Sequence, residues 1–218
     1  MKTYVEYRKQ VEEALSGQLR SLGEIPDILL KAMEYSLLAG GKRLRAVLLL
    51  ASCEAIGGDT GKALPFACAL EMIHTYSLIH DDLPGMDNDD YRRGRLTNHK
   101  VFGEGFAILA GDGLLNYAYE CILNNALAWG ENTPGHIRAA QEIARRAGVS
   151  GMVAGQSIDL LSEHREPNEA TLHYIHMHKT ADLLTAPLLA AAYIAGADEK
   201  SIAALRTFGA CVGLAFQI

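Results

Sequence analysis

The fold class follows from residues 61–82, GKALPFACALEMIHTYSLIHDD. Apolar side chains recur along this stretch with helical spacing and cover the predicted helix on nearly all sides. A helix that is apolar all round lies inside a protein rather than on its surface. The stretch therefore predicts a buried helix in the middle of a helical bundle.

Helical spacing also dominates the rest of the chain, and the predicted breaks fall at glycine and proline residues. We find no alternating strand pattern, no repeat of fixed period and no low-complexity linker. We therefore predict one all-α domain over residues 1–218, a bundle of roughly ten helices. The predicted helices lie near residues 3–21, 25–39, 42–56, 61–82, 98–129, 134–163, 168–178, 180–195 and 199–218.

Composition and charge exclude several classes of protein. The formal net charge of −6 argues against a nucleic-acid-binding surface. The longest apolar run without a charge, residues 183–197, is shorter than the ~18 residues that a membrane span needs, so it predicts a buried helix. The N-terminus has no apolar signal core, and the four cysteines form no CxxC pair. These features predict a cytoplasmic protein with reduced thiols and no zinc.

Charged residues crowd into residues 80–95, HDDLPGMDNDDYRRGR. Most acidic runs are solvated loops. Here the run follows an apolar helix, and carboxylates clustered near the interior repel one another unless a cation joins them. Hard cations such as Mg²⁺ prefer oxygen ligands and often bridge carboxylate to phosphate. The segment contains Asp81, Asp82, Asp87, Asp89 and Asp90, followed by Arg92, Arg93 and Arg95.

Spacing favours a metal site over a solvated loop. His74, Ser77 and Asp81 are spaced i, i+3, i+7 and share one face of the helix. The sequence LPGM at 83–86 breaks the helix, and the short loop can bring Asp87 back toward Asp81.

Three other kinds of site are excluded by position. An EF-hand that began at Asp87 would need glutamate at its twelfth position, where Asn98 stands. The segment GGDTGKA at 57–63 lacks the first glycine of a P-loop. The segment GEGFAI has Ile108 where a dinucleotide-binding glycine belongs.

A second basic cluster, GGKRLR at 40–45, opens a predicted helix, where free backbone N–H groups also favour anions. Lys42 and Arg45 share a helix face, and Arg43 points elsewhere. Taken alone, the cluster also fits a solvated helix start. In a net-acidic chain, two basic clusters suggest two bound anionic groups, and the acidic cluster suggests a bridging metal. Two diphosphate substrates would account for all three clusters.

At this point the sequence resembles the trans-isoprenyl diphosphate synthase family. The segment DDLPGMDNDDYRRG is similar to the first aspartate-rich motif of that family, and GGKRLR is similar to its isopentenyl diphosphate anchor. The resemblance covers essentially the whole chain and implies a bundle around a deep central cavity, the type I isoprenoid synthase fold. Further matching segments are EMIHTYSLIH at 71–80, LAGD at 109–112, GQSIDL at 155–160, HKT at 178–180 and AFQI at 215–218.

The resemblance also implies the roles of individual residues. Asp81, Asp82 and Asp87 would hold Mg²⁺ ions on the allylic diphosphate, with three ions in the complete enzyme and Mn²⁺ as an alternative. Arg92 and Lys179 would bind the same diphosphate. The residues that would hold isopentenyl diphosphate are Lys42, Arg45, His74 and Arg93. Thr180 and Gln217 would lie near the reacting carbons. Gln156 and Asp159 would line the cavity.

The C-terminus departs from the family pattern. The chain ends at Ile218 inside the apolar helical pattern FGACVGLAFQI, with no cap and no polar tail. In the family, FQ leads into a second aspartate-rich motif. We therefore expect that the domain is truncated before this motif, that the natural protein continues, and that the fragment given has severely reduced activity.

The implied function is a magnesium-dependent prenyltransferase that condenses isopentenyl diphosphate with dimethylallyl and geranyl diphosphates to give farnesyl diphosphate. Tyr76 and Ser77 lie ~6–7.5 Å below Asp81 along the helix, so the Tyr76 ring would form the floor for the growing chain and fix its length. Without the resemblance, Tyr76 also fits a plain core aromatic. The resemblance further implies a homodimer.

Three alternatives stay open at this stage. A geranylgeranyl diphosphate synthase would differ mainly in product length. A class I terpene cyclase needs one diphosphate site and would leave Lys42, Arg45 and Arg93 without a role. A non-catalytic subunit of a prenyl diphosphate synthase is supported only by the missing second motif.

Histidines near the implied site are ambiguous. His173 and His176 share a helix face, but His178 leaves it and no cysteine is near, which argues against a transition-metal site. His80 either orients a carboxylate or caps the core.

Overall fold

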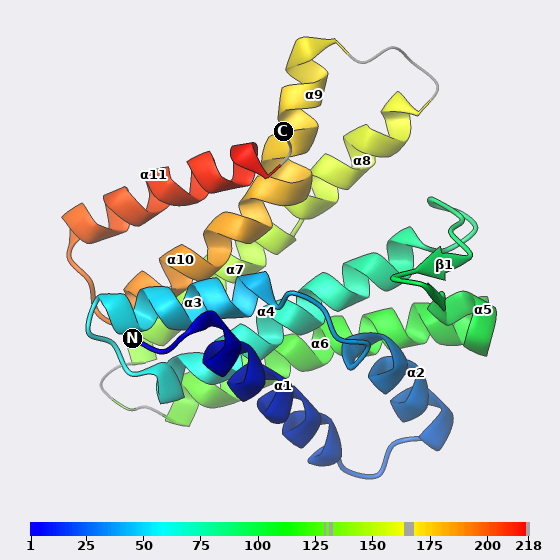
Figure 1. Ribbon diagram of the computed structural model, residues 1–218, viewed down its shortest axis with the longest axis horizontal. Helices are drawn as coiled ribbons and strands as arrows, with labels where there is room; N and C mark the ends of the chain where they lie inside the picture. Colours follow the sequence, from blue (N-terminus) through cyan, green and yellow to red (C-terminus); the bar gives the residue numbers. More distant parts are fainter. Residues whose placement is uncertain (129, 131–132, 164–167, 217–218) are drawn as a thin grey trace.

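The computed structural model describes residues 1–128, 130, 133–163 and 168–216. Helices account for nearly all regular structure in these residues, which confirms the predicted all-α fold (Figure 1). The helices are α1 (Tyr4–Arg20), α2 (Asp27–Leu37), α3 (Leu44–Ala55), α4 (Thr60–Asp81), α5 (Asn98–Phe102), α6 (Glu104–Ala128), α7 (Thr133–Ala147), α8 (Met152–Ser162), α9 (Glu169–Ile175), the π-helical turn η2 (His176–Ala181), α10 (Asp182–Ile194) and α11 (Glu199–Ala215).

Helix α4 lies in the middle of the bundle, as predicted from its sequence. It packs along α6 and α3 and also contacts α1, α2, α7 and α10. The face of α6 toward α4 is built largely from small residues, such as Ala107, Ala110 and Gly111, spaced at helical intervals. A Cβ atom on Gly111 would lie 2.2 Å from the His80 ring of α4, so only glycine permits this close approach.

Helix α10 is the second buried helix. It packs against α7, α11 and α3, and most of its residues are buried, in agreement with the prediction for residues 180–195. Across the described ranges, none of the helices combines the length and apolar character that a membrane crossing requires.

Two predicted long helices are each divided into two in the structure. The predicted helix at 98–129 is interrupted at Gly103, which has φ +85° and separates α5 from α6. The predicted helix at 134–163 is interrupted at 148–151, where the chain folds back against the end of α7. A Cβ atom on Gly151 would lie 2.1 Å from the Arg146 carbonyl oxygen, so this tight turn requires glycine.

The predicted break between residues 178 and 180 is absent. The chain runs without interruption from α9 through η2 into α10, and the π-helical turn widens the helix where we expected it to end. π-helical turns inside α-helices frequently occur at functional sites.

A short hairpin was not predicted. Strands β1 (Tyr91–Arg92) and β2 (Arg95–Leu96) pair antiparallel, and both residues of the turn between them have positive φ, +55° at Arg93 and +76° at Gly94. This is the backbone of a tight two-residue hairpin turn. Strands of two residues are too short to show an alternating pattern in the sequence.

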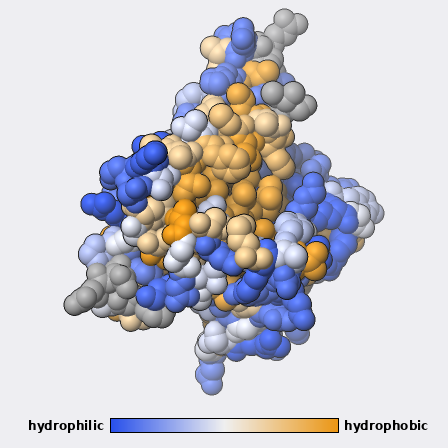
Figure 2. Space-filling model, turned by 60° about the vertical axis from the view of Figure 1, so that its left-hand side comes forward, coloured by the Kyte–Doolittle hydropathy of each residue, from blue (hydrophilic) through white to orange (hydrophobic). Residues whose placement is uncertain are grey.

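One face of the molecule carries a broad apolar area ringed by hydrophilic residues (Figure 2). Large apolar side chains are also exposed on α11 and just after its end, among them Phe208 and Phe216. Exposed apolar surface of this kind is typical of contact surfaces.

Candidate functional site

Two cavities that share Arg45, His74 and Leu78 lie on either side of the C-terminal half of α4. The first cavity has a volume of about 620 Å³ and lies between α2, α3, α4 and the hairpin. The second has a volume of about 360 Å³ and lies between α4, α8 and η2.

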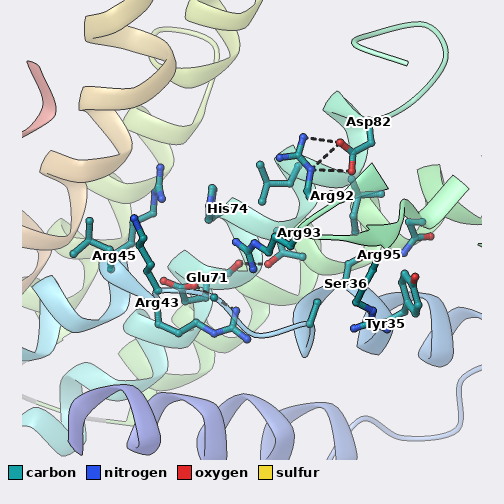
Figure 3. A pocket seen from close by; sticks show the side chains of 18 of the residues that line it. Tyr35, Ser36, Arg43, Arg45, Glu71, His74, Asp82, Arg92, Arg93 and Arg95 are labelled. Atoms are coloured by element: carbon teal, nitrogen blue, oxygen red, sulfur yellow. Dashed lines mark hydrogen bonds and ion pairs between the residues drawn. The ribbon is translucent and has the colours of Figure 1, made fainter. Parts of the chain in front are cut away.

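The first cavity is strongly basic (Figure 3). Its two acidic residues, Glu71 and Asp82, are each paired with an arginine. The remaining positive charge makes this cavity suited to a polyanion such as a diphosphate. The basic residues that line it are Arg8, Lys42, Arg43, Arg45, Arg92, Arg93 and Arg95, together with His74.

Arg43 fixes the backbone of this cavity and is not free to bind a ligand. It lies at the N-terminal end of α3 with φ +49°. Its buried guanidinium donates to the Leu37 carbonyl oxygen at 2.6 Å and to Glu12 at 3.2 Å, and it lies 3.5 Å from Glu71. Arg43 lines the same cavity as Lys42 and Arg45, although its guanidinium is bound by Glu12, Leu37 and Glu71. The structure differs from the prediction in that α3 begins only at Leu44, so Lys42 precedes the helix.

Arg45 and His74 lie between the two cavities. Burial lowers the pKa of Arg45 to about 10, which leaves it charged at neutral pH. Its Nε has no hydrogen-bond partner among the described residues. Burial, together with the charge of Arg45 and Arg93, holds the pKa of His74 well below its ordinary value. His74 is therefore a neutral imidazole at pH 7 and can offer a hydrogen bond but no charge.

The hairpin positions Arg92 and Arg93. Arg92 donates from Nε and Nη2 to both carboxylate oxygens of Asp82, at 2.6–3.0 Å. Arg93 turns the other way and donates to the Gly40 carbonyl oxygen. A Cβ atom on Gly41, which has φ +138°, would lie 2.5 Å from the Arg93 guanidinium, so glycine at this position leaves room for the Arg93 side chain.

The acidic segment divides between the two cavities, because Asp82 faces the first and Asp81 the second. The Asp87 N–H donates to the Asp81 carbonyl oxygen at 2.8 Å, so the loop does return as predicted. Burial raises the pKa of Asp81 to about 6; Lys179 opposes this increase and Asp87 adds to it. Burial also raises the pKa of Asp82, and Arg92 opposes this.

These carboxylates have the donor chemistry that a magnesium ion needs. Asp81 and Asp87 are adjacent oxygen donors, and a divalent cation would offset both the burial and the repulsion that raise the pKa of Asp81. In the part of the chain that the structure describes, no three His, Cys, Asp or Glu side chains are gathered closely enough to enclose a metal ion. The residues therefore fit Mg²⁺ in chemistry, without a completed coordination cage.

The opposite wall of the second cavity comes from α8 and η2. Lys179 and Thr180 of η2 line it, and so do Gln156 and Leu160 of α8. Lys179 forms an ion pair with Asp159, which does not itself line the cavity. The Gln156 side-chain nitrogen is buried without a hydrogen-bond partner among the described residues. Gln217 lies outside the described residues.

Tyr76 and Ser77 line the second cavity below Asp81. Tyr76 is 9% exposed. Its ring and the ring of His80 pack edge to face, with the ring centroids 5.7 Å apart. The Nε2 atom of His80 lies 3.1 Å from the Ile108 carbonyl oxygen. His80 therefore packs Tyr76 against α6, where the same Nε2 atom also lies 3.8 Å from a carboxylate oxygen of Asp112.

Some lining residues were not found from the sequence. Tyr35 lines the first cavity, and the Arg95 guanidinium lies 4.3 Å from its ring centroid. Arg95 was visible as the last arginine of the charged segment, but Tyr35 and Arg8 are remote in sequence and show no motif. Of the three histidines weighed as metal ligands, His178 contacts Asp182 instead.

Comparisons with known proteins agree on one family. The sequence model described as polyprenyl synthetase matches residues 26–218. A farnesyl diphosphate synthase from Geobacillus stearothermophilus is 52% identical over 98% of this chain and 71% of its own length. The large subunit 1 of a heterodimeric geranylgeranyl pyrophosphate synthase from Arabidopsis thaliana is 51% identical over 86% of this chain and 52% of its own length.

A solved structure is similar over the same range. The geranyltransferase from Legionella pneumophila superposes with a TM-score of 0.93 at 37% sequence identity, over 98% of this chain and 75% of that one. The chain thus spans between about half and about three quarters of the length of these similar proteins.

Proposed function

Because the chain belongs to the polyprenyl synthetase family, we propose that it joins isopentenyl diphosphate to an allylic diphosphate and releases inorganic diphosphate. The observation that carries this proposal is the pair of adjoining cavities, one basic and one lined by the Asp81 carboxylate, Lys179 and the Tyr76 ring. Two diphosphates need two such sites, whereas a terpene cyclase would need one.

The first cavity is proposed to hold isopentenyl diphosphate. Lys42, Arg45 and Arg93 supply positive charge, and neutral His74 supplies a hydrogen bond. Since Arg45 and His74 also line the second cavity, the isopentenyl carbon chain would point toward the allylic substrate. This is catalysis by positioning two reactants in one geometry.

The second cavity is proposed to hold the allylic diphosphate, with its carbon chain running down toward Tyr76. Asp81 and Asp87 would hold Mg²⁺ at this cavity, where it would supply positive charge that makes diphosphate a better leaving group. Asp82, the third carboxylate of the predicted set, would join them only by giving up its pairing with Arg92. Lys179 adds charge from the facing wall, and Arg92 adds charge from the first cavity. The C–O bond breaks, the allylic cation is attacked by the isopentenyl double bond, and the proton lost goes to the departing diphosphate.

Product chain length distinguishes the candidate products. We propose farnesyl diphosphate, because the bulky Tyr76 ring lines the second cavity and would limit the length of the growing chain; geranylgeranyl diphosphate is the alternative. The test supplies labelled isopentenyl diphosphate, dimethylallyl diphosphate and Mg²⁺ to the natural full-length protein and reads the dephosphorylated alcohols by chromatography. Farnesol supports the proposal. No elongation by a folded protein that binds diphosphate would refute it and favour a non-catalytic subunit.

Replacing Tyr76 with alanine is expected to lengthen the product by at least one isoprene unit, because removing the ring opens the floor of the second cavity. The same chromatographic assay measures this. Tyr91→Ala is the matched control, because Tyr91 is 66% exposed and lines neither cavity. Identical products from Tyr76→Ala and the natural protein would place the floor elsewhere.

The assembly is proposed to be a homodimer in the cytoplasm. Helix α6 carries exposed apolar side chains, including Phe106, Leu109 and Leu127, on the face away from α4. All four cysteines are free thiols, which suits a reducing compartment. Sedimentation equilibrium would check the dimer, and a monomer at micromolar concentration would contradict it.

A further inference from the structure

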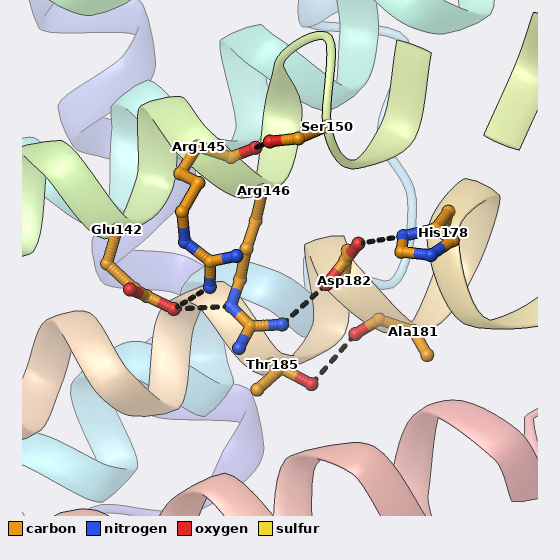
Figure 4. Close-up of polar contacts among 8 residues, drawn as sticks. All are labelled: Glu142, Arg145, Arg146, Ser150, His178, Ala181, Asp182 and Thr185. Atoms are coloured by element: carbon orange, nitrogen blue, oxygen red, sulfur yellow. Dashed lines mark hydrogen bonds and ion pairs between the residues drawn. The ribbon is translucent and has the colours of Figure 1, made fainter. Parts of the chain in front are cut away.

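A network of charged side chains joins α7 to the turn that carries Lys179 and Thr180 (Figure 4). Arg146, near the end of α7, donates from Nη1 to one carboxylate oxygen of Asp182 at 2.5 Å. The other oxygen of Asp182 lies 2.8 Å from Nδ1 of His178. Asp182 is the first residue of α10 and directly follows η2, so the network spans the end of the π-helical turn.

The network is largely shielded from water. The Arg146 and Asp182 side chains are 12% and 13% exposed. Glu142 holds Arg146 in place by accepting from its Nε at 2.6 Å. Burial opposes ionisation of Glu142, but hydrogen bonds from Arg146 and Arg145 outweigh it and lower the pKa of this carboxyl. A shielded ion pair of fixed geometry constrains its backbone far more than an exposed one does.

The turn that this network constrains is closely packed on its other sides. A Cβ atom on Gly155 of α8 would lie 2.2 Å from the Lys179 backbone nitrogen. A Cβ atom on Gly213 of α11 would lie 2.3 Å from the Ala181 side chain. Backbone therefore meets backbone on two sides of η2, and a small shift of the turn would move Lys179 and Thr180 relative to the second cavity.

We propose that Arg146 is a positioning residue for the reaction. Through Asp182 it holds the π-helical turn in the register that directs Lys179 and Thr180 into the second cavity. This inference rests on the proposed function, in which Lys179 stabilises the departing diphosphate. Neither Arg146 nor Asp182 lines either cavity, so any effect on catalysis must pass through η2.

The chain offers a matched control in the neighbouring residue. Arg145 lies on the same helix and donates to the same Glu142 oxygen at 2.8 Å, but it is 52% exposed and forms no ion pair with Asp182 in the described residues. Arg145→Met and Arg146→Met thus remove the same charge one position apart. Only the second variant releases Asp182.

The experiment measures kcat and KM for geranyl diphosphate and isopentenyl diphosphate separately, in the natural full-length protein. We expect Arg146→Met to lower kcat about 10- to 100-fold, because small misplacements of catalytic groups have effects of this size. The KM for isopentenyl diphosphate should stay within about twofold, since its binding residues lie on other elements, and Arg145→Met should match the natural protein.

A double-variant cycle tests whether Arg146 acts through Asp182. If it does, Arg146→Met combined with Asp182→Asn should be no worse than the poorer single variant. Asp182→Asn keeps the side-chain shape, so it also provides the measurement if Arg146→Met does not fold.

Two results would overturn the inference. One is a fall in melting temperature with kcat and both KM values unchanged, which would show a purely structural ion pair. The other is an equal loss of kcat in Arg145→Met and Arg146→Met. A failure of the proposed function would look different from both results. In that case the natural protein itself would form no prenyl product, and calorimetry would show no binding of a thiolodiphosphate analogue of geranyl diphosphate.

Discussion

Replacing Asp81 with asparagine lowers kcat/KM for the allylic diphosphate by about 100- to 1000-fold if the second cavity binds that substrate as proposed. The substitution keeps the size of the side chain and removes its charge. Asp81 lines the second cavity with Lys179. Burial and the nearby charge of Asp87 raise the pKa of Asp81, and Lys179 opposes this increase. Burial and the charge of Asp87 make the ionised form of Asp81 unfavourable. Asp81 is therefore suited to bind a cation rather than to stabilise the fold.

The measurement is steady-state kinetics of the natural full-length protein over a range of Mg²⁺ concentrations. The Asp81→Asn variant should also need a higher Mg²⁺ concentration for half-maximal activity, since one oxygen ligand is lost. Asp90→Asn is the control within the same acidic segment. Asp90 is exposed, pairs with Lys100 and lines neither cavity, so its loss should leave kcat/KM unchanged.

Equal kinetics for Asp81→Asn and Asp90→Asn would contradict the assignment of Asp81 to the reaction. It would mean that the charge of Asp81 takes no part in binding the metal or the diphosphate.

The sequence was sufficient for features that depend on local chemistry. The apolar periodicity of 61–82 predicted the buried helix α4, and the helix-breaking LPGM predicted that Asp87 returns to Asp81. These features depend on neighbours a few residues apart, so the local pattern contains most of the information. The i, i+3 argument for Lys42 and Arg45 does not hold as a helix face, because α3 begins only at Leu44.

The sequence was insufficient where packing between distant segments decides the outcome. The turn at 148–151 follows from the fit of Gly151 against the Arg146 carbonyl oxygen. The π-helical turn has no characteristic sequence pattern. Its extra residue is accommodated through contacts with α8 and α11. Nor could the pairing of Arg92 with Asp82 be foreseen, since the hairpin between them sets that distance.

The protonation of His74 shows the same limit. Its position on the cavity face of α4 followed from spacing, but its neutral state follows from burial and from arginines on α3 and the hairpin. A histidine expected to help hold a diphosphate can therefore do so as a neutral hydrogen-bonding group.

Replacing Arg43 with methionine should have the largest effect on stability of any substitution considered. We expect the free energy of unfolding to fall by about 3–5 kcal/mol, the usual cost of removing one partner of a buried ion pair. The Arg43 and Glu71 side chains are 3% and 4% exposed. Without Arg43, Glu71 keeps its hydrogen bond from the Ala46 N–H at 3.2 Å and the more distant charges of Arg45 and Arg93, but it loses its ion-pair partner among the described residues.

Urea denaturation followed by circular dichroism gives the free energy of unfolding and its midpoint. Lys9→Met is the control, because Lys9 and Glu13 are 77% and 68% exposed and 3.8 Å apart, and such a surface pair contributes little. A loss below about 1 kcal/mol in Arg43→Met would contradict the argument, since it would show that water or another cation reaches Glu71.

The double variant Arg43→Met with Glu71→Leu separates burial of charge from loss of packing. Replacing both members of a buried ion pair by apolar residues of similar size is often neutral, so most of the stability should return. Catalysis should not return with it. Arg43 adopts φ +49° and is anchored to the Leu37 carbonyl oxygen, and this arrangement orients the backbone on which Lys42 and Arg45 lie. We therefore expect the doubly substituted protein to be stable but to have a raised KM for isopentenyl diphosphate. This result would show that Arg43 is retained for the geometry of the basic cavity rather than for the stability of the bundle.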